Sequence, residues 1–135
     1  MRVLKIFGLI CLVAIMDCRS DANTQKQIGQ TEKGVAKITF VELGSINCIP
    51  CKAMQPVMKA IEEKYESQIK VVFYDVWQPD QKNYAQEYNI KLIPTQVFLD
   101  ENGKEIMRHE GFFAEEEIDA FLQKQGLKPN KGKSS

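Results

Sequence analysis

The sequence has little of the chemistry that a metal centre or a nucleic-acid interface requires. It contains a single histidine, His109, and only one pair of cysteines at CxxC spacing, Cys48 and Cys51. One such pair and one distant histidine cannot complete a tetrahedral zinc site, so we expect no metal. An excess of charge is also missing, because 18 Lys and Arg residues balance 18 Asp and Glu residues. This balance gives no reason to expect a nucleic-acid partner or an acidic substrate.

The N-terminal apolar run, Ile6–Met16, is too short to span a bilayer comfortably. It follows the basic residues Arg2 and Lys5 and precedes small residues at the spacing of a cleavage site, which is the pattern of a secretory signal. We therefore predict that residues 1–22 are a signal peptide or an N-terminal membrane anchor. Cys18 is the candidate for lipidation, although the residues before it fit a lipidation site poorly. Membrane contact is expected only through this segment, if it is uncleaved or lipidated.

The remaining chain divides by composition into three parts. Residues 23–34 are polar and lack a hydrophobic period, which predicts a flexible linker. Residues 35–127 carry the periodic apolar segments of a single domain of ordinary size. Residues 128–135 are polar and basic, which predicts a flexible tail.

Hydrophobic periodicity predicts alternating strands and helices in that domain. Apolar residues of both parities over residues 35–43 indicate a strand buried on two faces, and therefore a central one. Apolar residues at three-and-four spacing from Cys51 to Tyr65 indicate an amphipathic helix, kinked at Pro56. Because this helix separates the first two strands, those strands are expected to be parallel.

The later elements follow from the same patterns. We expect a strand over 69–76, a helix over 78–88, a hairpin of strands over 95–99 and 104–109 joined by an Asn-Gly turn, and a helix over 114–125. The predicted fold class is α/β, with a central mixed β-sheet flanked by helices in the order β-α-β-α-β-β-α.

The segment Cys48-Ile49-Pro50-Cys51 lies where the first predicted strand gives way to the first helix. Unpaired N–H groups and the positive end of the helix dipole favour a thiolate at Cys48. Cys51 lies one turn further in, close enough to form a disulfide, and Pro50 is tolerated in the first helical turn. Such a pair is suited to exchanging electrons as well as to crosslinking.

Several other residues stand at informative distances from this motif. Glu42 precedes the first cysteine by six positions, Pro56 lies in the following helix, Ile93-Pro94-Thr95 precedes a late strand, and Gly111 follows the last strand. Together with the CxxC motif, these residues resemble the thioredoxin superfamily over Val35–Gln125. The resemblance implies a thioredoxin-like fold and a thiol–disulfide oxidoreductase that uses no cofactor.

Disulfide exchange needs an attacking thiolate, a resolving thiol and a proton carrier, and Cys48, Cys51 and Glu42 fit these roles in that order. Because a carboxylate is costly to bury in an apolar central strand, we expect the pKa of Glu42 to rise toward working pH. The alternative for Glu42 is an exposed edge position. In the family the bond before Pro94 is cis, which aims backbone groups at the sulfur pair.

The resemblance also implies a mostly apolar substrate-binding surface around the cysteines, formed by Asn47, Ile49, Pro50, Ile93, Thr95 and Phe112. Asn47 stands where the family usually has an aromatic residue, and Phe73 stands where a lysine often pairs with the buried acid. These departures bear on substrate fit and on the tuning of the acid. Trp77 either lines this site or packs elsewhere, and His109 is expected at the surface.

The sequence therefore predicts a thiol–disulfide oxidoreductase that reduces disulfides of exported proteins. Ile49 and Pro50 add neither charge nor a side-chain donor that would stabilise the Cys48 thiolate, which favours a reductase over an oxidase. Its expected partners are disulfide-bearing protein substrates and a membrane thiol-reducing electron donor, in a bacterial periplasm or another extracytoplasmic space, and we expect a monomer. Two alternatives remain, a redox-silent binding module with a structural disulfide and a metal-binding CxxC protein.

Overall fold

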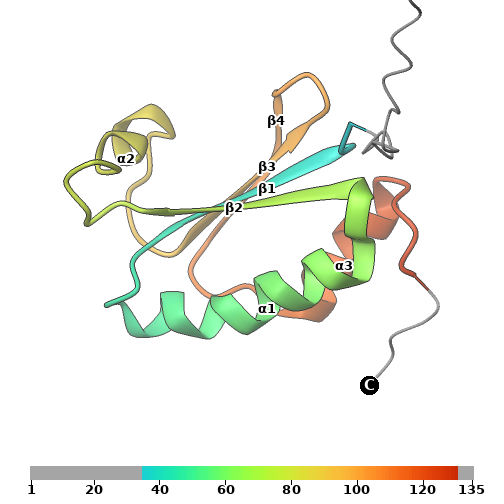
Figure 1. Cartoon of the computed structure of the whole chain (residues 1–135), viewed down its shortest axis with the longest axis horizontal. Coiled ribbons are helices and arrows are strands. Elements are labelled where there is room, and N and C mark those ends of the chain that lie inside the picture. Colours follow the sequence, from blue (N-terminus) through green and yellow to red (C-terminus); the bar gives the residue numbers. More distant parts are fainter. Residues whose placement is uncertain (1–34, 131–135) are drawn as a thin grey trace, which may run out of the picture. The chain divides into compact units, whose positions relative to one another are not determined.

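A four-stranded mixed sheet lies at the centre of the described part of the chain, residues 35–130 of this computed structural model (Figure 1). The strands lie in the order β2-β1-β3-β4, with β1 parallel to β2 and antiparallel to β3, and β3 antiparallel to β4. The elements are β1 (Ile38–Gly44), α1 (Ile49–Tyr65), the 3-10 helix η1 (Glu66–Gln68), β2 (Ile69–Asp75), α2 (Asn83–Glu87), β3 (Thr95–Asp100), β4 (Glu105–Glu110) and α3 (Glu115–Lys124). The predicted α/β class, element order and parallel pairing are confirmed.

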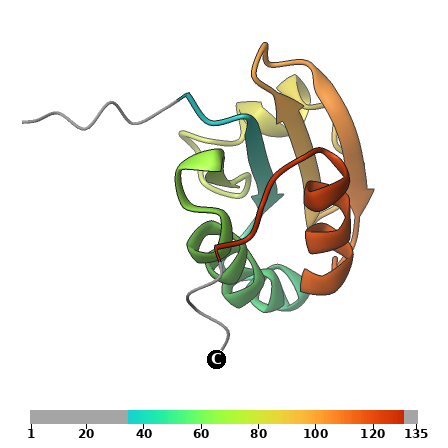
Figure 2. The same cartoon turned by 90° about the vertical axis from the view of Figure 1, so that its right-hand side faces the viewer.

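β1 is a central strand because both of its faces bury apolar side chains. On one face Phe40 stacks on Phe98 of β3, in a cluster that includes residues of α1 and α3. On the other face Val41 and Leu43 join a cluster that includes residues of α2. Figures 1 and 2 show the same arrangement, with α1 and α3 together on one face of the sheet and α2 on the other. Each fully buried side chain of this kind contributes about 1.5–3 kcal/mol to folding.

The apolar stripe predicted on the first helix faces the core, where Met54, Met58, Ile61 and Tyr65 are buried. Pro56 lies inside α1, and the helix continues past it to Tyr65. The Tyr65 hydroxyl donates to the Asp119 carboxylate of α3, and Lys64 Nζ lies 2.6 Å from Glu115 Oε1. These contacts join the C-terminal end of α1 to α3.

The second helix is shorter than predicted, because α2 covers Asn83–Glu87 and not the whole of residues 78–88. The segment before it is held in turns by hydrogen bonds that periodicity does not reveal. Gln78 N–H donates to the carbonyl oxygen of Asp75, and the Gln81 side-chain oxygen accepts from Asp75 N–H at 2.9 Å. Residues 78–82 therefore form turns that lead from the end of β2 into α2.

The structure adds detail at both ends of the predicted domain. The first strand begins at Ile38 and not at Val35, which is exposed and unpaired in the sheet. At the other end, the tail predicted from Lys128 is tied to the domain as far as Asn130. Lys128 N–H donates to Gln68 Oε1, and Asn130 N–H donates to the carbonyl oxygen of Lys64.

The predicted signal or anchor over 1–22, with Cys18, the predicted linker over 23–34 and the last part of the predicted tail, 131–135, lie outside the described residues. Within residues 35–130 no helix combines the length and the apolar character needed to cross a bilayer.

Candidate active site

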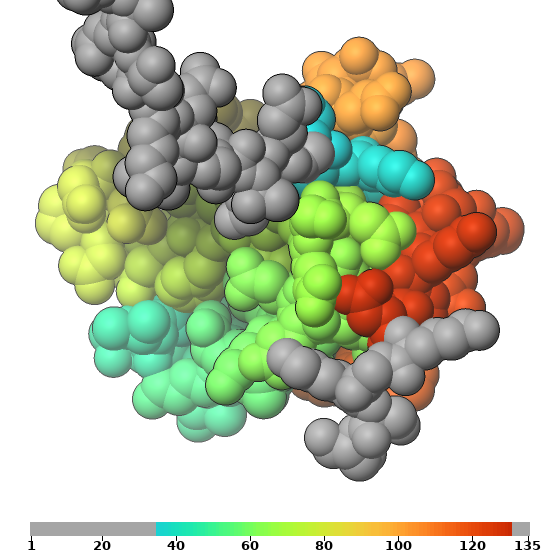
Figure 3. Space-filling view, turned by 45° about the vertical axis from the view of Figure 1, so that its right-hand side comes forward, coloured from blue at the N-terminus to red at the C-terminus, as the bar shows by residue number. Residues whose placement is uncertain are grey.

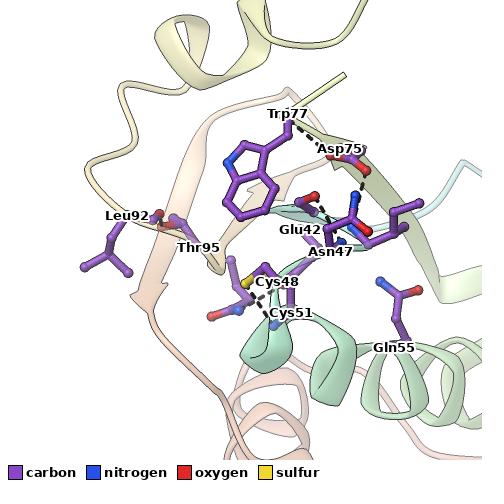
Figure 4. Close-up of a disulfide and its surroundings, with 12 residues drawn as sticks. Glu42, Asn47, Cys48, Cys51, Gln55, Asp75, Trp77, Leu92 and Thr95 are labelled. Atoms are coloured by element: carbon purple, nitrogen blue, oxygen red, sulfur yellow. Dashed lines mark hydrogen bonds between the residues drawn. A yellow bond between two sulfur atoms is a disulfide. The ribbon is translucent and has the colours of Figure 1, made fainter. Parts of the chain in front are cut away.

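The two cysteines of the CxxC motif lie at the start of α1 and are joined in a disulfide (Figure 4). Cys48 is the N-cap residue, and its sulfur accepts a hydrogen bond from Cys51 N–H at 3.4 Å. Cys48 N–H donates to the carbonyl oxygen of Ser45, which fixes the loop before the helix. Pro50 occupies the first turn of α1, where its missing N–H has no intrahelical partner to lose. The predicted placement of the motif is confirmed.

The two sulfurs differ in their access to solvent. Cys51 is fully buried, whereas Cys48 keeps 8% of its surface exposed. Cys51 packs directly over Gly44, where an added Cβ would lie 3.2 Å from both Cβ and Sγ of Cys51 and 3.3 Å from the Phe73 ring. Only glycine therefore lets β1 approach the cysteine this closely without displacing a neighbour. Of the two sulfurs, Cys48 alone can meet a partner from outside.

Glu42 lies two residues before Gly44 on β1 and is fully buried, so the exposed alternative is excluded. Its neighbours across the sheet are Phe73 on β2 and Gln96 on β3. Gln96 Nε2 donates to Glu42 Oε2 at 2.9 Å. Burial raises the pKa of Glu42 from 4.5 to about 8, although the Gln96 hydrogen bond works to lower it. The carboxyl group can therefore gain and lose a proton near neutral pH.

The loop before β3 carries the predicted cis peptide bond between Ile93 and Pro94. The Pro94 carbonyl oxygen accepts from Gly111 N–H at 2.8 Å, which joins this loop to the end of β4. Thr95 has no exposed surface, and its hydroxyl donates to the carbonyl oxygen of Leu92 at 2.7 Å. Its side chain therefore stabilises the loop. It does not lie on the substrate-binding surface, where the sequence analysis had placed it.

The predicted surface residues Asn47, Ile49, Pro50 and Phe112 are exposed, and Ile93 is partly exposed. Three further apolar side chains are at least 46% exposed, namely Ile46, Trp77 and Leu92, of which Ile46 and Leu92 were not predicted for this surface. Figure 4 shows Trp77 pointing from the end of β2 toward the cysteine pair, which favours the first of its two predicted placements. In Figure 3 the segment after β2 lies next to the start of α1 on the surface of the molecule.

Asp75 holds these two segments together and was not predicted as part of the site. Its carboxylate accepts from Ile46 N–H at 3.2 Å and from Trp77 N–H at 3.1 Å. Burial works to raise the pKa of Asp75, but these backbone hydrogen bonds hold it below its ordinary value. The available signal was an acidic residue at the very end of a strand that is mostly apolar. Sequence analysis also missed Gln96, the one amide side chain of β3.

His109 on β4 is partly exposed, stacks on Phe113 with ring centroids 4.1 Å apart, and lies with Nε2 3.1 Å from the carbonyl oxygen of Phe112. Among residues 35–130, no three His, Cys, Asp or Glu side chains are grouped so that they could hold a metal ion.

A family model, known sequences and solved structures all identify one family. The thioredoxin-like domain family matches residues 22–126. A thioredoxin of Porphyra purpurea is 48% identical over 48 residues, which are 36% of this chain and 43% of that protein. The putative thioredoxin H10 of Arabidopsis thaliana is 30% identical over 113 residues, covering 70% of this chain and 71% of the relative.

Solved structures agree with this assignment. A thioredoxin from Nicotiana alata is 32% identical with a TM-score of 0.57, covering 68% of this chain and 76% of that one. A thioredoxin from Halobacterium salinarum has the same TM-score at 20% identity, which shows the fold alone. The chain therefore belongs to the thioredoxin-like domain family, and its Cys48–Cys51 pair is that of a thiol–disulfide oxidoreductase.

Proposed function

We propose that the protein reduces disulfide bonds of exported proteins by dithiol–disulfide exchange at Cys48 and Cys51. The observation that carries this proposal is the unequal burial of two cysteines that share the first turn of one helix. Exchange requires one sulfur that meets the substrate and one that is protected until a mixed disulfide has formed. Cys48 suits the first task and Cys51 the second.

The proposed reaction begins when the Cys48 thiolate attacks one sulfur of a substrate disulfide. The substrate S–S bond breaks, its second sulfur leaves as a thiolate, and Cys48 is joined to the substrate. Cys51 then loses its proton to the carboxylate of Glu42 and attacks the Cys48 sulfur, which releases the second substrate thiolate. The substrate gains two electrons, and the protein is left as the Cys48–Cys51 disulfide. A thiol donor must return two electrons before the next cycle.

The direction of exchange depends on how strongly the protein stabilises the Cys48 thiolate. Ile49 and Pro50 carry no charge and no side-chain donor, and the exposed Lys52 is screened by solvent. Only the helix N-terminus then favours the thiolate, so the oxidised form stays comparatively stable and the dithiol is a good electron donor.

We predict a reduction potential near the thioredoxin value of about −270 mV, well below the strong-oxidase value of about −120 mV. Equilibration of the purified protein with glutathione buffers, followed by quantification of free thiols, measures it. A potential more positive than about −180 mV would mean that the protein oxidises or isomerises its substrates. Failure to equilibrate at all would favour the redox-silent alternative.

We further propose that the protein works as a monomer outside the cytoplasm, where a membrane thiol-reducing partner supplies electrons. The support is the apolar leader between Arg2 and Ala22. We expect fractionation of cells that express the full chain to recover it in the envelope, whereas the same chain starting at residue 23 stays in the cytoplasm. Recovery of the full, uncleaved chain in the cytosol would contradict the proposal.

A further inference from the structure

Two buried side-chain oxygens in the part of the chain that the structure describes have no hydrogen-bond partner, Glu42 Oε1 and Gln96 Oε1. They belong to the two side chains that already share the bond from Gln96 Nε2 to Glu42 Oε2 at 2.9 Å. Neither residue has any exposed surface. An unsatisfied buried polar atom destabilises the folded state, so two of them in one contact call for an explanation.

The unsatisfied oxygens reflect what the Glu42 carboxyl group and the Gln96 amide can donate. An ionised carboxylate only accepts hydrogen bonds, and so does the oxygen of an amide. While Glu42 is ionised, its Oε1 and the Gln96 Oε1 therefore cannot satisfy one another. One proton on Glu42 Oε1 turns that oxygen into a donor. A carboxylic acid and a primary amide can then pair through two hydrogen bonds, N–H to the acid carbonyl and O–H to the amide carbonyl.

We propose that Gln96 is a positioning residue for Glu42, and that in the oxidised protein, where burial keeps Glu42 a neutral acid, the two side chains form a two-point acid–amide pair with the proton on Glu42 Oε1. The role in exchange rests on the proposed function, because the proton held in this pair is the one that Glu42 passes to and from Cys51. β-strand register supports the pairing, since Glu42 on β1 and Gln96 on β3 lie directly opposite each other. Side chains at such positions share one face of the sheet and lie close enough to touch.

Within residues 35–130, no titratable group of another residue forms a hydrogen bond with the Glu42–Gln96 pair. On α1, Cys51 is held in the disulfide with Cys48. On β2, Phe73 does not titrate, and the carboxylate of Asp75, which pairs in register with Gly44, binds two backbone N–H groups of the neighbouring loops. From β4, His109 pairs with Gln96 in register, while its Nε2 lies 3.1 Å from the carbonyl oxygen of Phe112. The acidic groups of α3 that bind Lys64 and Tyr65 lie at the C-terminal end of α1, away from the cysteines. Burial, which raises the pKa of Glu42 to about 8, agrees with a neutral acid at pH 7.

The pair can be tested on the oxidised full chain by infrared spectroscopy of the protonated carboxyl group. We expect a carboxylic-acid carbonyl band at pH 7 that disappears in Glu42→Gln, which assigns it. In Gln96→Met, a variant of similar size without the amide, the band moves to higher frequency because both hydrogen bonds are lost. The exposed Gln55 provides a matched control, and Gln55→Met leaves the band in place.

The role in exchange is tested by the pH profile of the step that releases substrate from the mixed disulfide. Gln96→Met moves its midpoint upward by about one pH unit, because the charged form of Glu42 loses its donor and such bonds are the stronger ones. A band that is absent in the parent protein, or unshifted in Gln96→Met, overturns the acid–amide pair. A pH profile unchanged in Gln96→Met overturns the positioning role.

The two measurements distinguish absence of the acid–amide pair from absence of the proposed proton transfer. Exchange that is unaffected in Glu42→Gln rejects the proton transfer proposed above, and the infrared band still decides whether the acid–amide pair exists. If Gln96→Met does not fold, the 13C shift of the Glu42 carboxyl group in the parent protein replaces it. A neutral-acid shift at pH 7 supports the pair, and titration at an ordinary glutamate midpoint overturns it.

Discussion

Cys48→Ser is expected to abolish disulfide reduction, whereas Cys51→Ser is expected to attack a substrate disulfide once and remain joined to it. The first variant loses the only sulfur of the pair with exposed surface. The second keeps that sulfur but lacks the thiol that resolves the mixed disulfide. We expect turnover to fall by at least about a thousandfold in both, since each removes a group that forms or breaks a bond in the cycle.

Because Cys48 is the N-cap residue of α1, the effect of Cys48→Ser on the chemistry can be separated from an effect on the helix. Serine is a favoured N-cap residue, so Cys48→Ser preserves the start of α1, where the cysteine sulfur now accepts from Cys51 N–H. Loss of activity in this variant is then a loss of chemistry and not of the helix. Turnover is measured with a disulfide-bearing protein substrate and a dithiol donor, and the trapped species is identified by mass spectrometry.

Iodoacetamide provides an independent check on the reduced parent protein. One equivalent at mildly acidic pH is expected to label Cys48, because a thiolate at a helix N-terminus reacts while a buried thiol does not. Predominant labelling of Cys51, or a stable mixed disulfide in Cys48→Ser and not in Cys51→Ser, would reverse the assignment of the two roles.

Glu42→Gln is expected to stabilise the protein at alkaline pH while slowing exchange. Between pH 4.5 and about 8 the folded protein keeps a proton on Glu42 that the unfolded chain has already released. The unfolded state thus binds fewer protons, and the free energy of unfolding falls as pH rises through this window. The loss is complete above the folded-state pKa and amounts to about 3–5 kcal/mol for a shift of this size.

The amide introduced by Glu42→Gln does not titrate, and it can make two hydrogen bonds to the Gln96 amide. We therefore expect the variant to lack this pH-dependent loss and to exceed the parent in stability at pH 9. Urea unfolding of the oxidised proteins from pH 5 to 9 measures the difference. Glu101→Gln, on the exposed hairpin turn, is the matched control and is expected to keep the parent slope. Parallel curves for the parent and Glu42→Gln would show that Glu42 is already ionised in the folded protein.

Three features of the fold could be predicted from hydrophobic periodicity and turn signals alone. The apolar stripe of α1, the burial of β1 on both faces and the Asn-Gly turn of the hairpin each follow from the spacing of a few neighbouring residues. The cysteine motif and the cis bond before Pro94 were predicted from a resemblance that combines several such spacings.

The features that were missed depend on which residues meet across the sheet. Gln96 becomes informative only once the register places it opposite Glu42. Thr95 is fully buried, and its hydroxyl binds the backbone of its own loop. Asp75 likewise gains its role from two N–H groups in segments about 30 residues apart. Hydrophobic periodicity carries no record of register or of side-chain-to-backbone hydrogen bonds, so these contacts had to come from the structure.

The chain has one tryptophan, and it stands on the surface that carries the cysteines, 59% exposed and pointing toward the disulfide (Figure 4). Its backbone is held by the same carboxylate that holds the loop before Cys48, so a shift of either segment changes the surroundings of the indole. All tryptophan emission therefore comes from one place beside the sulfur pair. Tryptophan fluorescence can report the opening of the disulfide and the binding of a substrate without an attached label.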